Sequence, residues 1–150
     1  IPAGFTIRPL KGEMEAEGYV DLHQQVFETK NMTVAWRRRM IQSQGYLPEL
    51  DLVAEAPDGE LAAFCIAWVC EVGGGNKIGQ IEPLGCRADF RKYGLGRLVL
   101  AEALRRLQTY GIEQIVVETD DYRNTALRLY QAMGFFQKSE ILVYRKDYVD

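Results

Sequence analysis

Apolar positions along the chain change between a spacing of two, typical of strands, and a spacing of three to four, typical of helices. Strand spacing is found over 5–8, 51–56, 60–71, 77–88, 114–119 and 141–149. Helical spacing is found over 13–29, 95–110 and 124–133, and over a segment capped by Thr33 that runs to residue 41. This order predicts an α/β (α+β) fold with helices on both faces of a mixed central sheet of about six or seven strands.

Glycine-containing segments separate the three middle strands. Pro57-Asp58-Gly59 has the composition of a tight turn, because proline fixes one backbone angle and glycine tolerates a positive φ. A second such segment covers 73–76, so the strands are expected to form consecutive hairpins. Gly134 is expected to end the last helix in the left-handed conformation.

The composition fits one globular domain spanning 1–150. Of the 150 residues 47% are apolar, which is enough for a continuous core. The first residue is Ile1 rather than Met, which also fits one domain of a longer protein. The apolar runs are too short for a membrane span, so we expect no membrane partner and a cytoplasmic location.

The charge pattern argues against a nucleic-acid partner. The net charge is −3 and most cations are dispersed. A run of three arginines over 37–39 is interpreted as a solvated helix face.

Metal ligands are not expected. The chain has one histidine, His23, interpreted as a satisfied helix residue, with a position facing a substrate site as the alternative. Its cysteines lie in apolar runs without metal-ligand spacing, and free thiols are the expected state of Cys65, Cys70 and Cys86.

The segment 91–97 has the composition of an anion-binding turn. It holds Gly94 and Gly96 with Arg91, Lys92 and Arg97, between a predicted strand and a predicted helix. Glycines let the backbone approach an anion, and the first N–H groups of a helix favour negative charge. The dinucleotide fingerprint needs a glycine at 99, and the P-loop needs Lys and Ser or Thr after the second glycine; the sequence has neither.

Two motifs in register resemble those of the GCN5-related N-acetyltransferases. Arg91-x-x-Gly94-x-Gly96 is similar to the family's Gln/Arg-x-x-Gly-x-Gly/Ala motif, whose amides hold the pyrophosphate of acetyl-coenzyme A. The segment 124–135 is similar to its later motif, Asn-x-x-Ala-x-x-Leu-Tyr-x-x-x-Gly-Phe. The resemblance implies acetyl-CoA as cosubstrate and the family's fold.

Coenzyme contacts are carried over from this resemblance, together with one inference from the strand itself. The resemblance implies contacts from the loop residues Arg91, Lys92, Tyr93, Gly94, Leu95, Gly96 and Arg97 and from Asn124 and Tyr130; capping is the other interpretation of Asn124. Pro83 cannot donate to a sheet ladder and Gly85 leaves space, so the strand is expected to be unpaired on one side near 82–86. A pantetheine arm could use Leu84, Gly85 and Cys86 there; an ordinary edge distortion or bulge is the other interpretation. The resemblance implies that strand amides face the thioester oxygen, and the nearest such amide here is that of Leu84 or Gly85.

Acetyl transfer to an amine also needs a base and an acid. Glu82 is the first candidate for the base and Glu118 the second, with surface pairing and strand termination as the other interpretations. Asp120 and Asp121 are weaker candidates that would add to an acidic mouth. The resemblance implies Tyr130 as the acid that protonates the departing thiolate; core packing is the alternative.

The leading hypothesis is an N-acetyltransferase that acts by direct attack in a ternary complex. A non-catalytic acyl-CoA binding or sensing domain is the alternative, and a nucleotide-binding regulatory domain is a third. The acceptor is expected to be a small-molecule or peptide amine, and a homodimer or a second acetyltransferase domain remains open.

Overall fold

Five strands form one mixed sheet in the computed structural model, which describes residues 1–119 and 124–137. The strands are β1 (Thr6–Pro9), β2 (Asp51–Glu55), β3 (Leu61–Glu71), β4 (Lys77–Cys86) and β5 (Ile115–Val117). The α-helices are α1 (Ala16–Phe27), α2 (Val34–Ile41), α3 (Leu95–Thr109) and α4 (Asn124–Ala132). Short 3-10 helices are η1 (Gly12–Glu15), η2 (Pro48–Leu50) and η3 (Ala88–Tyr93). Two compact units divide the chain: Ile1–Glu118 contains the sheet and Thr119–Asp150 contains α4.

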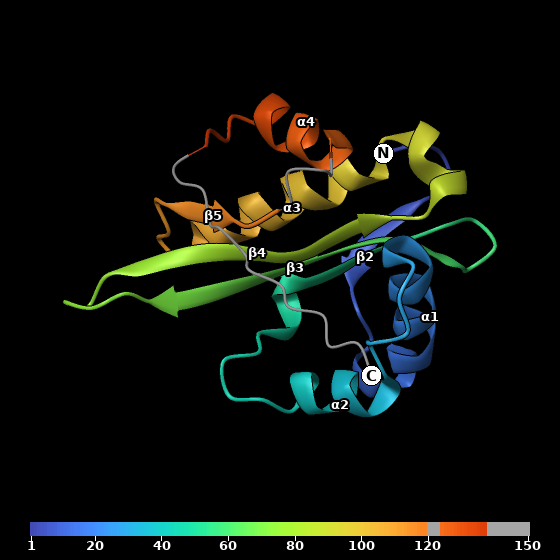
Figure 1. Ribbon diagram of the computed structural model, residues 1–150, viewed down its shortest axis with the longest axis horizontal. Coiled ribbons are helices and arrows are strands. Elements are labelled where there is room, and N and C mark those ends of the chain that lie inside the picture. Colours follow the sequence, from blue (N-terminus) through green and yellow to red (C-terminus); the bar gives the residue numbers. More distant parts are fainter. Residues whose placement is uncertain (120–123, 138–150) are drawn as a thin grey trace, which may run out of the picture. The chain divides into compact units, whose positions relative to one another are not determined.

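The sheet has the order β1-β2-β3-β4-β5. Neighbours from β1 to β4 are antiparallel, and β5 is parallel to β4 because the chain crosses back through α3 (Figure 1). The mixed α/β class is therefore confirmed. The described residues hold five strands, and the strand predicted over 141–149 lies outside them.

Both predicted hairpin turns are present. Gly59 has φ +90°, and its N–H donates to the Ala56 carbonyl at 2.9 Å. The second turn contains three consecutive glycines with positive φ, a conformation that other residues adopt only with strain.

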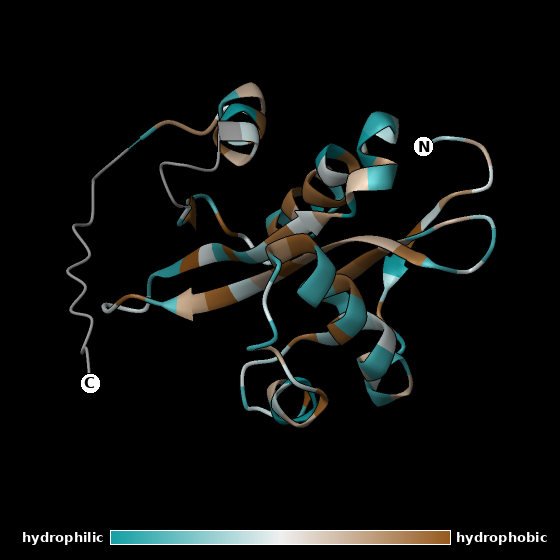
Figure 2. Cartoon of the chain, turned by 45° about the vertical axis from the view of Figure 1, so that its right-hand side comes forward, coloured by the Kyte–Doolittle hydropathy of each residue, from teal (hydrophilic) through white to brown (hydrophobic). Residues whose placement is uncertain are grey.

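Helices cover both faces of the sheet within the first unit. Helices α1 and α2 lie on one face and α3 on the other (Figure 1). The core on the α1 face is formed by Leu10, Tyr19, Val20, Leu22, Val53, Phe64 and Ile66. The buried residues of α3 are Leu95, Val99, Leu100, Ala103 and Leu107. In Figure 2 the hydrophobic colouring follows β3 and α3, as expected for a strand and a helix at the centre of a layered fold.

Helix α2 begins as predicted, with the Thr33 side chain accepting a hydrogen bond from the Trp36 N–H at 3.1 Å. The expectation that residues 37–39 form a solvated face is wrong for Arg37. This side chain is 0% exposed and pairs with Asp51, also 0% exposed, at 2.5 Å. Arg38 and Arg39 are exposed, as expected. Helical geometry explains the difference, because consecutive residues point about 100° apart and only one of the three can face the sheet.

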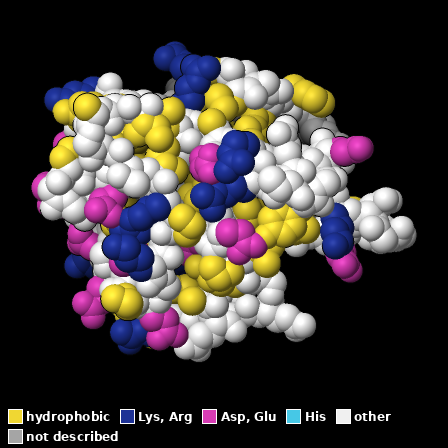
Figure 3. All heavy atoms as spheres, turned by 180° about the vertical axis from the view of Figure 1, so that it is seen from behind, with side chains coloured by type: hydrophobic (Ala, Val, Ile, Leu, Met, Phe, Trp, Pro, Cys, Tyr) yellow, Lys and Arg dark blue, Asp and Glu magenta, His cyan; other side chains and the backbone are white. Residues whose placement is uncertain are grey.

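Within the described residues, no helix is both long and apolar enough to span a bilayer. On the face shown in Figure 3, basic and acidic side chains are interspersed.

Candidate active site

Strands β4 and β5 pair over only three positions, after which β5 ends and β4 continues. The pairs are Gly79 with Ile115, Gln80 with Val116 and Ile81 with Val117. Strand β4 continues to Cys86, so its last five residues have no ladder on the β5 side among the described residues. The prediction of a one-sided strand near 82–86 is confirmed.

A β-bulge in β4 lies at the point where the strands part. Leu84 pairs with Cys65 and Ile81 pairs with Ala67, so Glu82 and Pro83 together face the single residue Ile66. The extra residue reverses the alternation of side chains. A Cβ on Gly79 would meet Leu107 of α3, whereas a Cβ on Gly85 would meet Val26 of α1.

The packing beside Gly85 explains why this residue is glycine. A Cβ there would lie 2.6 Å from both Phe64 Cζ and Val26 Cγ1. The space next to Gly85 on this face is therefore occupied by core side chains. The sequence analysis expected Gly85 to leave free space for a pantetheine arm. On the α1 face of β4 this expectation is wrong, because Phe64 and Val26 fill the space.

The amides at the end of β4 alternate between the paired and the unpaired side. The Arg87 N–H donates to Ala62 of β3 at 2.9 Å, which fixes the phase of the antiparallel ladder. Because every second N–H points to the same neighbour, Gly85 points its N–H towards β3, and Leu84 and Cys86 point theirs to the open side.

Glu82 and Glu118 each follow the last paired position of their strand, which is Ile81 with Val117. Both side chains are exposed. Since alternation places the residue after Ile81 on the opposite face of β4 from α3, the Glu82 carboxylate projects from the α1 face. The Glu82 carboxylate accepts a hydrogen bond from the Gln80 amide at 3.2 Å. The sheet register thus places the two candidate bases directly after the same β4–β5 pair.

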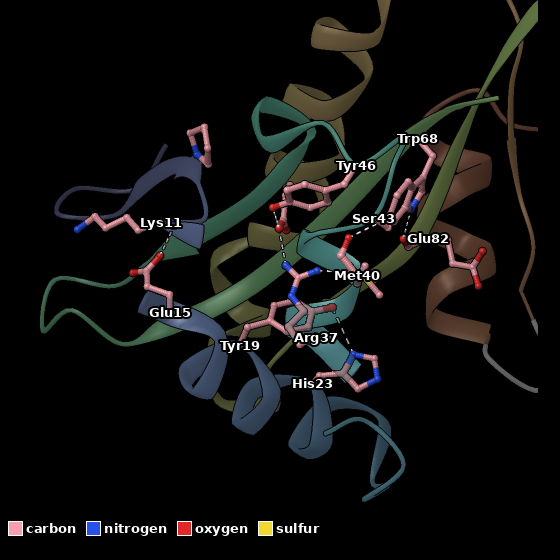
Figure 4. Close-up of polar contacts among 12 residues, drawn as sticks. Lys11, Glu15, Tyr19, His23, Arg37, Met40, Ser43, Tyr46, Trp68 and Glu82 are labelled. Atoms are coloured by element: carbon pink, nitrogen blue, oxygen red, sulfur yellow. Dashed lines mark hydrogen bonds and ion pairs between the residues drawn. The ribbon is translucent and has the colours of Figure 1, made fainter. Parts of the chain in front are cut away.

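Two aromatic residues that the sequence did not single out form a pair that contacts Glu82 through Trp68. The Trp68 Nε1–H donates to the Glu82 carbonyl at 2.9 Å, and the Tyr46 ring lies 6.3 Å from the Trp68 ring (Figure 4). Both side chains are half-buried. The sequence did contain a signal for Trp68. Side chains alternate between the two faces of β3, so Trp68 lies on the same face as Phe64 and Ile66.

The N-terminus of α3 directly follows η3. Gly94 is left-handed, with φ +68°, and occupies the N-cap of α3. Its own N–H donates to the Arg91 carbonyl at 3.1 Å, and the first bond across the start of α3 runs from Leu98 N–H to the Gly94 carbonyl. The N–H groups of 95–97 therefore precede the first helical bond of α3, the arrangement that favours an anion.

Cationic side chains are exposed around this helix start. Arg91, Lys92 and Arg97 are exposed, and Lys92 Nζ lies 5.2 Å from the centre of the Tyr93 ring. Cys86 is half-buried beneath the loop. Burial raises its pKa to about 11, although the Arg91 charge and the Gly96 amide act in the opposite direction.

Helix α4 belongs to the second unit and is described by itself. It begins at Asn124 and is followed by Gly134, whose φ of +93° confirms the predicted left-handed end. Tyr130 is 8% exposed, and its ring lies 5.6 Å from the Phe135 ring. Asp120 and Asp121 lie outside the described residues.

His23 is half-buried on α1, with Nδ1 3.4 Å from the Tyr19 hydroxyl. Burial, and then the Arg37 charge, lower its pKa. In the described part of the chain, no three His, Cys, Asp or Glu residues could together hold a metal ion. The three cysteines are free, and Cys65 is fully buried.

The unpaired end of β4 and the N-terminus of α3 belong to an α/β domain with helices on both faces of a mixed sheet. The model of the Acetyltransferase (GNAT) family matches residues 16–135, so the chain belongs to that family.

Mycothiol acetyltransferases are among the relatives in sequence. The protein from Thermobispora bispora is 26% identical over 97% of this chain and 51% of its own length. The protein from Salinispora tropica is 25% identical over 97% of this chain and 49% of its own length. The chain thus spans about half the length of these curated relatives.

Solved structures with the same fold include aminoglycoside acetyltransferases. AAC(6')-Ih from Acinetobacter baumannii has a TM-score of 0.76 at 15% identity, with 97% of this chain and 99% of that chain covered. AAC(6')-Iy in complex with CoA has a TM-score of 0.76 at 21% identity, with 97% and 98% covered. At these identities the likeness establishes the fold alone.

Proposed function

We propose that this chain is an acetyltransferase domain that transfers the acetyl group of acetyl-CoA to a primary amine by direct attack in a ternary complex. The observation that carries the proposal is the parting of β4 from β5 at Glu82. It offers open backbone groups and a carboxylate at one place, in a chain of the Acetyltransferase (GNAT) family.

The coenzyme is expected to use two parts of the first unit. Its pyrophosphate would accept hydrogen bonds from the Leu95, Gly96 and Arg97 amides, where the α3 dipole favours negative charge. Exposed Arg91 and Lys92 would add attraction without fixing the geometry. The pantetheine arm would follow the open side of β4, where Leu84 and Cys86 present N–H groups.

Glu82 is the proposed base. An alkylammonium ion has a pKa of about 10, so only about one molecule in a thousand is a free amine at pH 7. Glu82 would accept the proton as the amine nitrogen attacks the thioester carbon, directly or through a water molecule. Its exposed side chain and position at the strand opening support this role; Glu118, at the same opening, is the second candidate.

The remaining steps need an oxyanion donor and an acid. The Leu84 N–H is the proposed donor, since the ladder directs it to the open side whereas the Gly85 N–H faces β3. When the carbon–sulfur bond breaks, the thiolate would take a proton from the Tyr130 hydroxyl and leave as free CoA. The position of Tyr130 in the later motif supports this assignment.

The acceptor is proposed to be a small-molecule amine. The sequence relatives are named mycothiol acetyltransferases, and the structural neighbours are aminoglycoside acetyltransferases. Because the chain spans about half of those sequence relatives, we propose that residues 1–150 form one acetyltransferase domain that acts alone, as a homodimer or beside a second such domain.

The test is acetyl-CoA binding by calorimetry together with release of free thiol across a panel of amines. Amine-dependent thiol release would support catalysis, whereas binding without release under any amine would indicate a coenzyme-sensing domain. Tyr130→Phe removes only the hydroxyl, so coenzyme affinity should persist while transfer slows by a factor of about 10² to 10⁴. An unchanged single-turnover rate would reduce Tyr130 to a packing residue.

A further inference from the structure

We propose that Trp68 and Tyr46 form, with Glu82, the acceptor subsite, and that it selects cationic primary amines without a neighbouring carboxylate. The inference rests on the proposed function and adds the chemistry of the acceptor to it. Trp68 and Tyr46 come from β3 and from the segment that precedes β2, so neither belongs to the coenzyme loop.

The register of the sheet places Trp68 next to Glu82, the proposed base. It pairs with Gln80 across the β3–β4 ladder, and Gln80 holds the Glu82 carboxylate at 3.2 Å. The Trp68 indole N–H is bonded to the Glu82 carbonyl at 2.9 Å, which fixes the ring at the bulge. The indole N–H is thus already hydrogen-bonded, and the carbon atoms of the half-buried ring remain available for apolar contact with a ligand.

Tyr46 is held against Trp68 by a buried ion pair. Its hydroxyl donates to Asp51 Oδ2, and the same oxygen accepts from Arg37. The Arg37 guanidinium lies 3.8 Å from the centre of the Tyr19 ring, and both Arg37 and Asp51 are 0% exposed. With its hydroxyl anchored, the Tyr46 ring meets Trp68 edge to face at 65° and forms the second side of an aromatic corner (Figure 4).

The corner and the carboxylate together suit an ammonium group on a hydrocarbon. An ammonium ion is attracted to an indole face and to a carboxylate, while the carbon skeleton of the amine replaces water on the rings. Figure 4 shows the Glu82 carboxylate directed away from the Arg37 cluster. Arg37 is fully buried and paired, so it offers no exposed cation to a carboxylate on the acceptor. An α-carboxylate on the amine would instead meet Glu82 and be repelled.

Direct binding can be followed at Trp68 because the chain has only two tryptophans. Trp36, on α2, is 55% exposed and serves as the matched control. In Trp36→Phe, saturated with CoA, titration with 2-phenylethylamine should change the Trp68 fluorescence in a saturable way. In Trp68→Phe, which keeps Trp36, the same titration should give no saturable change.

Specificity is tested with L-phenylalanine, which is 2-phenylethylamine with an added α-carboxylate. It should bind at least about tenfold more weakly than the amine, because the carboxylate is repelled by Glu82 and the buried, paired Arg37 cannot compensate it. Equal affinity for the two ligands would overturn the proposed selectivity.

Kinetics separate an acceptor role from a structural one. Trp68→Leu should raise KM for 2-phenylethylamine by about tenfold and leave KM for acetyl-CoA unchanged, whereas Trp36→Leu should change neither. Tyr46→Phe keeps the ring but releases it from Asp51, so it should raise the amine KM by a smaller factor, again without an effect on the coenzyme. A loss of stability in Tyr46→Phe with an unchanged amine KM would overturn its positioning role.

Failure of this inference is distinct from failure of the proposed function. A flat fluorescence titration, or an unchanged amine KM in Trp68→Leu, in a protein that binds acetyl-CoA and releases thiol would overturn the subsite alone. Absence of acetyl-CoA binding would overturn the proposed function, and this inference with it. If Trp68→Leu does not fold, the fluorescence titration of Trp36→Phe still tests whether the amine binds at Trp68.

Discussion

Glu82 combines three local features that few surface glutamates share. It follows the last β4–β5 pair, it lies in the bulge of β4, and its carbonyl accepts the Trp68 indole N–H. These features fix the backbone of Glu82 while its carboxylate remains exposed to solvent. A residue of this kind can accept a proton from a ligand without losing a structural ion pair.

The prediction at the residue scale concerns Glu82→Gln. If Glu82 accepts the amine proton, the variant should slow transfer by a factor of about 10² at neutral pH. The defect should shrink as the pH rises, because the free amine then forms without a base. The measurement is the pH profile of thiol release at saturating acetyl-CoA.

Glu118→Gln is the matched control, since Glu118 directly follows the same β4–β5 pair and should matter little. A larger, pH-dependent defect in Glu118→Gln would exchange the two roles. If neither variant alters the pH profile, proton removal is left to water.

At the scale of elements, α3 carries a left-handed glycine just before its first residue and another just beyond its last turn. Gly94 precedes the first turn with φ +68°, and Gly111 follows the last turn with φ +73°. A Cβ on either would meet no atom within 4 Å. Substitution at the two positions therefore causes similar backbone strain, but only Gly94 adjoins the amides proposed to hold pyrophosphate.

Gly94→Val should weaken acetyl-CoA binding at least about tenfold, whereas Gly111→Val should leave it unchanged. Both should lower stability by a similar amount, about 1–2 kcal/mol, because a side chain in the left-handed region is strained. Calorimetry and thermal unfolding of the two variants check this. Equal coenzyme affinity in both folded variants would contradict the loop assignment.

For the whole molecule, the Arg37–Asp51 pair links α2 to β2 inside the core on the α1 face. Arg37 Nε and Asp51 Oδ1 are buried without a hydrogen-bond partner in the described part of the chain. A buried pair of this kind is expected to contribute little net stability, but removing one partner leaves the other charge uncompensated.

Arg37→Met should therefore lower the free energy of unfolding by about 3–5 kcal/mol, measured by urea denaturation. Arg38→Met, at an exposed neighbouring position, should change it by less than about 0.5 kcal/mol. Replacing both charged partners, with Arg37→Met and Asp51→Asn, should recover part of the loss. A small effect of Arg37→Met would show that Asp51 is satisfied without the guanidinium.

For the described residues, local patterns in the sequence determined which segments form the main helices and strands, where the hairpin turns lie, and that α3 starts just after Gly94. These features depend on neighbours in the chain: the spacing of apolar residues, a threonine cap, and glycines at positive φ. The one-sided end of β4 was also readable, because Pro83 cannot donate a hydrogen bond to a ladder.

Only the tertiary structure decided which distant residues meet. Three successive arginines look alike in the sequence, but the packing of α2 on the sheet buries Arg37 alone and pairs it with Asp51. The end of the β3–β4 ladder directs the Leu84 N–H to the open side, and the β3–β4 register places Trp68 beside Glu82. Register and burial arise from contacts between elements far apart in the chain, so the periodicity of any one element cannot specify them.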